Sequence, residues 1–197
     1  MAVALVGLVF VYASDFLTNK SGTSSAANSG SYNITIAAKP IVVPKAWTTS
    51  TINTDDEVLS NVELAIPMNV GNEETALHIS LLPSAKAAPS AYLLDSLYIH
   101  NFEEGAPKQA YGLIVKSLKP QAGYEDETIW YDAISANPFV AKCLEEKLGD
   151  DTQTNCITTM LVNKRVSALV RFDGDLLPYW KGLHAELSKL LPTFNRE

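Results

Sequence analysis

The 197-residue sequence lacks the short motifs that mark common enzymes and cofactor-binding proteins. It contains no Gly-x-Gly-x-x-Gly stretch, no Walker loop, no His-Glu-x-x-His and no EF-hand loop. It also lacks Gly-x-Ser-x-Gly, the turn that presents the nucleophilic serine of many hydrolases. These absences lead us to expect a non-enzymatic protein that needs no cofactor, and we assign no catalytic, cofactor-binding or metal-binding residue.

Histidine is scarce, and its three copies, His78, His100 and His184, do not have the spacing of a metal site. We interpret each as an ordinary structural or surface residue. The acidic run 125–127 has the residue types for acid–base catalysis or cation binding, but a solvated loop explains it better. A deep pocket that joins His78 or His100 to the acidic loops would instead indicate an envelope enzyme or ligand-binding protein whose site only the fold creates.

Positive charge is in short supply, because 15 basic residues stand against 22 acidic ones and the net charge is −7. The basic residues are scattered, without a stripe and without interleaved aromatic residues. Nucleic-acid binding requires a concentrated basic surface, so we exclude it. An acidic domain is soluble and can also attract a basic protein partner.

Cysteine occurs only at Cys143 and Cys156. An even count without a Cys-x-x-Cys motif favours a local disulfide over a metal or redox site. Such a bridge would stabilise the fold by roughly 3 kcal/mol and would place the domain in an oxidising compartment, which in a bacterium is the periplasm. Two free buried thiols are the alternative.

Charge is absent from residues 1–13, and residues 1–17 are apolar enough for a membrane anchor. As a helix they would cover roughly 25 Å, slightly less than the hydrocarbon core of a bilayer. Its candidate membrane-facing side chains are Val3, Leu5, Leu8, Phe10, Tyr12 and Phe16. A signal peptide, or an apolar helix packed on protein, are the alternatives.

Residues 18–31 are rich in Ser, Gly and Asn and predict a flexible linker. Residues 32–197 then predict one globular extracytoplasmic domain. Alternation of apolar and polar residues predicts strands at 32–38, 61–66, 75–82, 110–118, 156–162 and 166–172. The run 41–43, bracketed by prolines, suits an edge strand. Residues 92–100 are ambiguous between a strand and a helix, and residues 101–109 predict an acidic tip.

Two helices are predicted late in the chain. The first would begin after Asn137 with Pro138 in its first turn, span about 138–148 and stop at Gly149. The second, about 176–191, has a strong amphipathic pattern and ends at Pro192. The predicted fold class is therefore α+β: an N-terminal transmembrane helix, then a domain rich in antiparallel sheet with two late helices.

The anchor, the cysteine pair and the missing motifs favour a non-catalytic accessory or structural subunit of a larger membrane protein complex. We expect a single-pass protein of the inner membrane with an acidic head in the periplasm, whose partners are integral membrane subunits and the lipid bilayer. The layout also resembles that of pilin-like filament subunits, which join an N-terminal apolar helix to an antiparallel sheet and often carry a late cysteine pair. The linker after Leu17 departs from that pattern.

Overall fold

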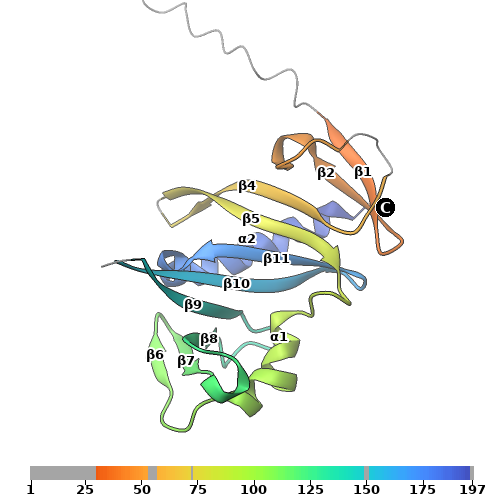
Figure 1. Cartoon of the computed structure of the whole chain (residues 1–197). Coiled ribbons are helices and arrows are strands. Elements are labelled where there is room, and N and C mark those ends of the chain that lie inside the picture. Colours follow the sequence, from red (N-terminus) through yellow and green to blue (C-terminus); the bar gives the residue numbers. More distant parts are fainter. Residues whose placement is uncertain (1–29, 53–56, 72, 149–150, 196–197) are drawn as a thin grey trace, which may run out of the picture.

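A computed structural model describes residues 30–52, 57–71, 73–148 and 151–195. Its centre is an eight-stranded antiparallel sheet with the order β4-β5-β11-β10-β9-β8-β7-β6 (Figure 1). The strands are β4 (Val62–Val70), β5 (Glu73–Pro83), β6 (Lys108–Ala110), β7 (Leu113–Ser117), β8 (Glu127–Tyr131), β9 (Val140–Leu148), β10 (Asp151–Asn163) and β11 (Val166–Asp173). The predicted antiparallel sheet is confirmed.

A smaller sheet of order β2-β1-β3 lies beside β4 and β5 (Figure 1). Strands β1 (Ser31–Ile36) and β2 (Lys39–Pro44) form an antiparallel hairpin, and β3 (Glu57–Leu59) pairs parallel to β1. Strand β2 is at the edge, as its prolines predicted, because a residue without an amide hydrogen cannot complete a central ladder. The 3₁₀ turn η1 (Lys45–Trp47) then leads the chain toward β4.

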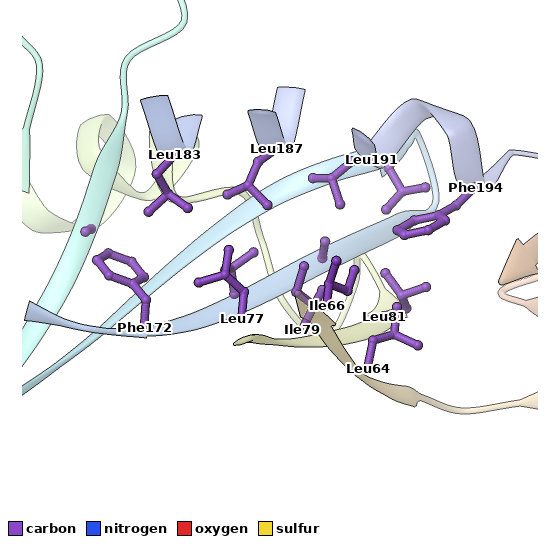
Figure 2. Packing of buried hydrophobic residues seen from close by; sticks show 14 of the residues in the cluster. Leu64, Ile66, Leu77, Ile79, Leu81, Phe172, Leu183, Leu187, Leu191 and Phe194 are labelled. Atoms are coloured by element: carbon purple, nitrogen blue, oxygen red, sulfur yellow. The ribbon is translucent and has the colours of Figure 1, made fainter. Parts of the chain in front are cut away.

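One face of the large sheet is covered by α2 (Trp180–Leu190), with the 3₁₀ turns η5 (Gly174–Tyr179) before it and η6 (Leu191–Phe194) after it. The predicted late amphipathic helix is confirmed, but its α-helical part begins at Trp180 rather than at residue 176, and a 3₁₀ turn continues it past Pro192. Figure 2 shows its leucines pointing at the sheet, where Leu183 and Leu187 are fully buried against residues such as Leu77 and Ile79. This cluster is the main hydrophobic core.

The opposite face is covered near β8 and β9 by a short helical segment made of α1 (Ser90–Leu93), η2 (Leu94–Tyr98) and η3 (Ile99–Asn101). The ambiguity at residues 92–100 is thus resolved as helix. Leu94 and Tyr98 pack on Ile129 and Val140 in a second, smaller cluster. A further 3₁₀ turn, η4 (Pro120–Ala122), precedes β8.

The predicted helix over 138–148 is wrong, because these residues contain strand β9. Asn137 does not cap a helix; its N–H donates to Ser135 Oγ in a turn (3.2 Å). Strand β9 pairs with both β8 and β10 and is covered on both faces near its start, so its residues there read as a continuous apolar run rather than an alternating one. Pairing on both sides overrides the local helix signals.

Strand β8 was also missed. The predicted strand 110–118 is confirmed as β7, except that its first residue, Ala110, ends β6. The chain reverses between β6 and β7 at Tyr111 and Gly112, which have positive φ of 55° and 79°. A Tyr-Gly pair is a suitable turn because glycine adopts this conformation without steric cost. The turn places Tyr111 on the surface.

The predicted membrane anchor, including Val3, Leu5, Leu8, Phe10, Tyr12 and Phe16, lies outside the described residues, as does nearly all of the predicted linker 18–31. Among the residues that the structure does describe, none of the helices has the length and apolar character needed to cross a membrane.

Candidate functional site

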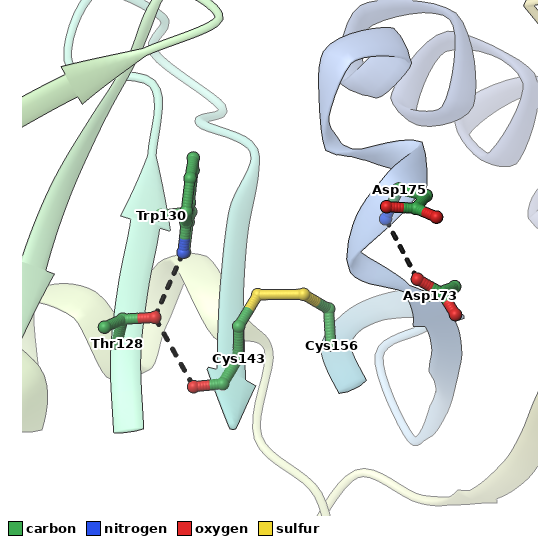
Figure 3. The surroundings of a disulfide bond; sticks show 6 residues. All are labelled: Thr128, Trp130, Cys143, Cys156, Asp173 and Asp175. Atoms are coloured by element: carbon green, nitrogen blue, oxygen red, sulfur yellow. Dashed lines mark hydrogen bonds between the residues drawn. A yellow bond between two sulfur atoms is a disulfide. The ribbon is translucent and has the colours of Figure 1, made fainter. Parts of the chain in front are cut away.

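Cys143 and Cys156 form a disulfide, as predicted (Figure 3). They are directly opposite one another on β9 and β10, with a Cα–Cα distance of 4.1 Å. Because they are cross-strand neighbours, the bridge does not connect a helix to a strand as the sequence suggested. Both side chains are buried, so the disulfide is a structural link in the centre of the sheet rather than a reactive group.

The three histidines lie on three different elements: His78 on β5, His100 on η3 and His184 on α2. His78 and His100 are exposed, and the hollow beside His78 contains Arg171 and Asp173 rather than the acidic loops. His184 on α2 is half-buried against the edge of the Phe139 ring, 5.8 Å between ring centroids. Burial lowers the pKa of His184, and the charge of Asp132 opposes this shift.

No group of three or more His, Cys, Asp or Glu side chains in the described part of the chain is placed to hold a metal ion. The acidic run 125–127 is only partly a solvated loop. Glu125 and Asp126 are exposed, whereas Glu127 belongs to β8, where one of its carboxylate oxygens accepts a hydrogen bond from Lys142 Nζ (2.7 Å). This pairing gives the carboxylate a structural role.

A group of aromatic side chains lies where the β6–β7 turn meets the start of α2. We call Tyr111, Trp130, Tyr179 and Trp180 the aromatic patch. The Tyr111 and Trp130 rings are stacked, with centroids 6.2 Å apart and planes 15° from parallel. Trp180 Nε1 donates to the Tyr111 carbonyl (2.9 Å), and this hydrogen bond connects the start of α2 to the β6–β7 turn. Tyr111 and Tyr179 are nevertheless 57% and 46% exposed.

Backbone and side-chain contacts restrict the rings of the aromatic patch. Gly71, in the β4–β5 turn, lies directly against Tyr179, and a Cβ at Gly71 would come within 2.6 Å of the ring. Beneath the patch, Phe139 stacks on Trp180 with ring centroids 5.5 Å apart. Trp130 Nε1 donates to Thr128 Oγ1 (3.0 Å; Figure 3). Exposed aromatic rings with so little freedom lose little entropy when another molecule covers them.

Beside Trp130, the patch continues into a hollow of about 440 Å³ that the predicted acidic tip borders. The carboxylates along it are Glu103, Glu104 and Glu145, and Lys108 and Lys116 also line it. Lys116 Nζ donates to the carbonyls of Glu103 (2.9 Å) and Gly105 (2.8 Å). The tip is therefore held against β7 rather than projecting freely, and its carboxylates stand next to the aromatic patch.

The sequence did not predict the aromatic patch, because its members come from three separate segments. The Tyr-Gly turn at 111–112 and the adjacent Tyr179-Trp180 pair were the available signals. Neither identifies a surface until the sheet order brings β6–β7 next to α2. Chemically, the patch offers stacking faces, phenol hydroxyls and neighbouring carboxylates, groups that are common in protein-binding surfaces.

No protein-family model matches the chain, and no curated protein matches it significantly. Two solved structures have a similar fold. The immunity protein Smlt3025 of the Stenotrophomonas maltophilia type IV secretion system aligns with a TM-score of 0.55 and 11% identity over 85% of this chain and 94% of that one. The Neisseria meningitidis iron-regulated outer membrane lipoprotein FrpD aligns with a TM-score of 0.51 and 8% identity over 86% and 94%. At these identities the likeness shows the fold.

Proposed function

We propose that this protein is a non-catalytic, protein-binding component of the bacterial cell envelope. Its domain binds another protein through the aromatic patch. In the more specific form of the proposal, residues 1–17 anchor it in the inner membrane and the acidic domain acts in the periplasm. There it serves as an accessory subunit of a larger membrane complex.

The observation that carries the proposal is the combination of exposure and rigidity in the aromatic patch. Exposed tyrosines and tryptophans are enriched among the residues that contribute most to protein–protein binding. Tyr111 and Tyr179 have this exposure. The Tyr111 ring stacks on Trp130, and the Tyr179 ring lies against Gly71. The bordering Glu103 and Glu104 favour a partner with basic side chains around its contact surface.

The envelope location is supported by two independent features. The buried disulfide between β9 and β10 is of a kind that persists in oxidising compartments such as the periplasm. One of the two proteins with a similar fold is named as an outer membrane lipoprotein. The other is named as an immunity protein of a secretion system, a class in keeping with a binding role without catalysis.

The test is a pull-down of the full-length protein in mild detergent, with mass spectrometry of the retained proteins. The wild type is compared with the double variant Tyr111→Ala/Tyr179→Ala. Removing two aromatic hot-spot contacts is expected to weaken binding at least about tenfold, since a hot-spot residue contributes more than about 1 kcal/mol. We expect a stoichiometric membrane-complex partner with the wild type and its loss with the double variant.

Tyr92→Ala is the matched control, because Tyr92 is a tyrosine on α1 that is 64% exposed but lies outside the aromatic patch. It should retain the partner at the wild-type level. The proposal fails if the wild type is recovered alone, or if the double variant retains as much partner as Tyr92→Ala does.

A further inference from the structure

A groove of about 320 Å³ runs beside the second half of β10. Strand β9 pairs with β10 only as far as Lys142 opposite Ile157, while β10 continues along β11 to Asn163. Beyond Ile157 the other edge of β10 has no partner strand within the described residues. Residues 137–140, the start of α1 and the second half of α2 form the walls of this groove.

The edge of β10 presents backbone hydrogen-bonding groups to this groove. In an antiparallel sheet, alternate residues direct both N–H and C=O to the same neighbour. Thr159 N–H points away from β11 and donates to Ser90 Oγ (2.8 Å). Leu161, two residues further, therefore presents its N–H and C=O on the same side, and no hydrogen bond to that amide is formed within the described residues.

The side chains of the groove are uncharged. Its lining, all within the described residues, includes no lysine, arginine, aspartate or glutamate. Pro89, Phe139 and Met160 provide apolar walls, while Thr158 and Ser188 add hydroxyl groups. His184 also lines the groove, and the lowered pKa of its imidazole favours the neutral form. In a protein of net charge −7, this neutral lining fits an occupant without charges.

We propose that the groove binds an extended, uncharged segment of the partner protein as an added strand on the edge of β10. A strand rises about 3.3 Å per residue, so residues 159–161 present roughly 10 Å of edge, enough for a short segment. The segment would receive a hydrogen bond from Leu161 N–H and donate to the carbonyls of Leu161 and Thr159. Ser90 occupies the remaining position of this ladder and ends the groove. Strand addition of this kind obtains its affinity from main-chain hydrogen bonds.

The groove and the aromatic patch belong to neighbouring surfaces. Phe139 stacks on Trp180 of the patch and also packs against His184 in the groove, with the two ring planes at 62°. A single partner can therefore cover the aromatic patch and place an extended segment on β10. The inference rests on the proposed function, because it assumes the same protein partner, and it adds the way in which that partner is held.

Two substitutions at Leu161 separate the backbone from the side chain. Leu161→Pro removes the amide hydrogen that points into the groove. It breaks no hydrogen bond to β11, because this amide faces away from β11, and proline is tolerated at such positions. Leu161→Ala shortens the exposed side chain and keeps the amide. With the partner identified in the pull-down, we expect Leu161→Pro to weaken binding at least tenfold and Leu161→Ala less than threefold.

Amide hydrogen exchange on the wild-type complex gives an independent readout and does not require the proline variant to fold. Exchange at Leu161 should slow at least tenfold when the partner binds. The strand-addition proposal is overturned, and the proposed function survives, if the partner binds without protecting this amide or if Leu161→Ala loses as much affinity as Leu161→Pro. If the wild type retains no partner, the proposed function and this inference fail together.

Discussion

The two ends of the eight-stranded sheet are stabilised in different ways. Strands β4, β5, β11 and β10 lie under α2, where a continuous set of fully buried leucine, isoleucine and valine side chains fills the layer (Figure 2). Strands β7 and β8 contribute Leu113 and Trp130 to the edge of this layer. Their other face packs on the irregular helical segment α1–η3 in a small cluster around Ile129 and Leu118. Hydrophobic burial scales with apolar area, so the α2 end contributes most of the stability.

The small cluster also borders charged groups, whereas the buried polar residues of the α2 end are serines and threonines, among them Ser167, whose Oγ has no hydrogen-bond partner within the described residues. Glu127 and Lys142 form an ion pair there, and Glu127 Oε2 has no hydrogen-bond partner within the described residues. Burial, together with the charge of Glu127, raises the pKa of the Tyr98 phenol to about 12. Regions with few apolar contacts open at lower free energy than the global fold. We therefore expect β6–β8 to open before the strands under α2.

The largest effect should come from the α2 end. Leu187→Ala removes a fully buried side chain from the main core and should lower the free energy of unfolding by about 4 kcal/mol. Leu118→Ala makes the same change in the small cluster and should cost about 2 kcal/mol, since a thinner layer can close around the space. Urea unfolding of both variants measures the difference. Equal losses would contradict the proposed asymmetry.

The disulfide connects the two ends, because Cys143 is on β9 and Cys156 is on β10. The double variant Cys143→Ala/Cys156→Ala should lose about 3 kcal/mol of stability. The loss should also be uneven, with amide exchange of β8 accelerated more than that of β5. Uniform acceleration of both strands would mean that the sheet opens as one unit and that the small cluster is not a separate region.

The ion pair of the small cluster should matter more than its surface counterpart. The Lys142 and Glu127 side chains are 25% and 17% exposed, so Lys142→Ala would leave a largely buried carboxylate unpaired and should cost about 2 kcal/mol. Lys189→Ala breaks an exposed pair with Glu186 on α2 and should cause no measurable loss. Thermal unfolding of the two variants tests this contrast, and similar losses would count against it.

The same asymmetry explains which predictions from sequence succeeded. The β10–β11 hairpin and α2 were predicted because each has one face on the main core and therefore a clear period of two or of about 3.6. The exposed first part of β10, from Asp151, was missed because it has no buried face. Strand β9 is covered on both faces near its start, so its sequence there does not alternate between apolar and polar residues. Asn137-Pro138 in addition matches the pattern of a helix start, and the segment was therefore predicted as a helix. The cysteine pair was predicted from count and spacing, but its cross-strand geometry required β9 to be a strand.

The aromatic patch and the β10 groove could not be predicted for a related reason. Each joins segments that only the sheet order brings together, such as the 111–112 turn with Trp180, or Ser90 with Thr159. Single residues carried some signal, as the Tyr179-Trp180 pair did. A binding surface made of non-local contacts leaves no spacing pattern in one sequence.

The smallest expected effect is a pH dependence at the α2 end. Burial lowers the pKa of His184 in the folded state, with Asp132 acting in the opposite direction. Below about pH 6.5 the His184 imidazole therefore binds a proton more readily in the unfolded chain than in the folded protein. Stability should fall as the pH decreases from 7 to 5. His184→Gln should flatten this decline, while His100→Gln, an exposed position on η3, should leave it unchanged. Urea midpoints measured at pH 7 and pH 5 give the slopes. An unchanged slope in His184→Gln would show that groups other than His184 cause the loss of stability in acid.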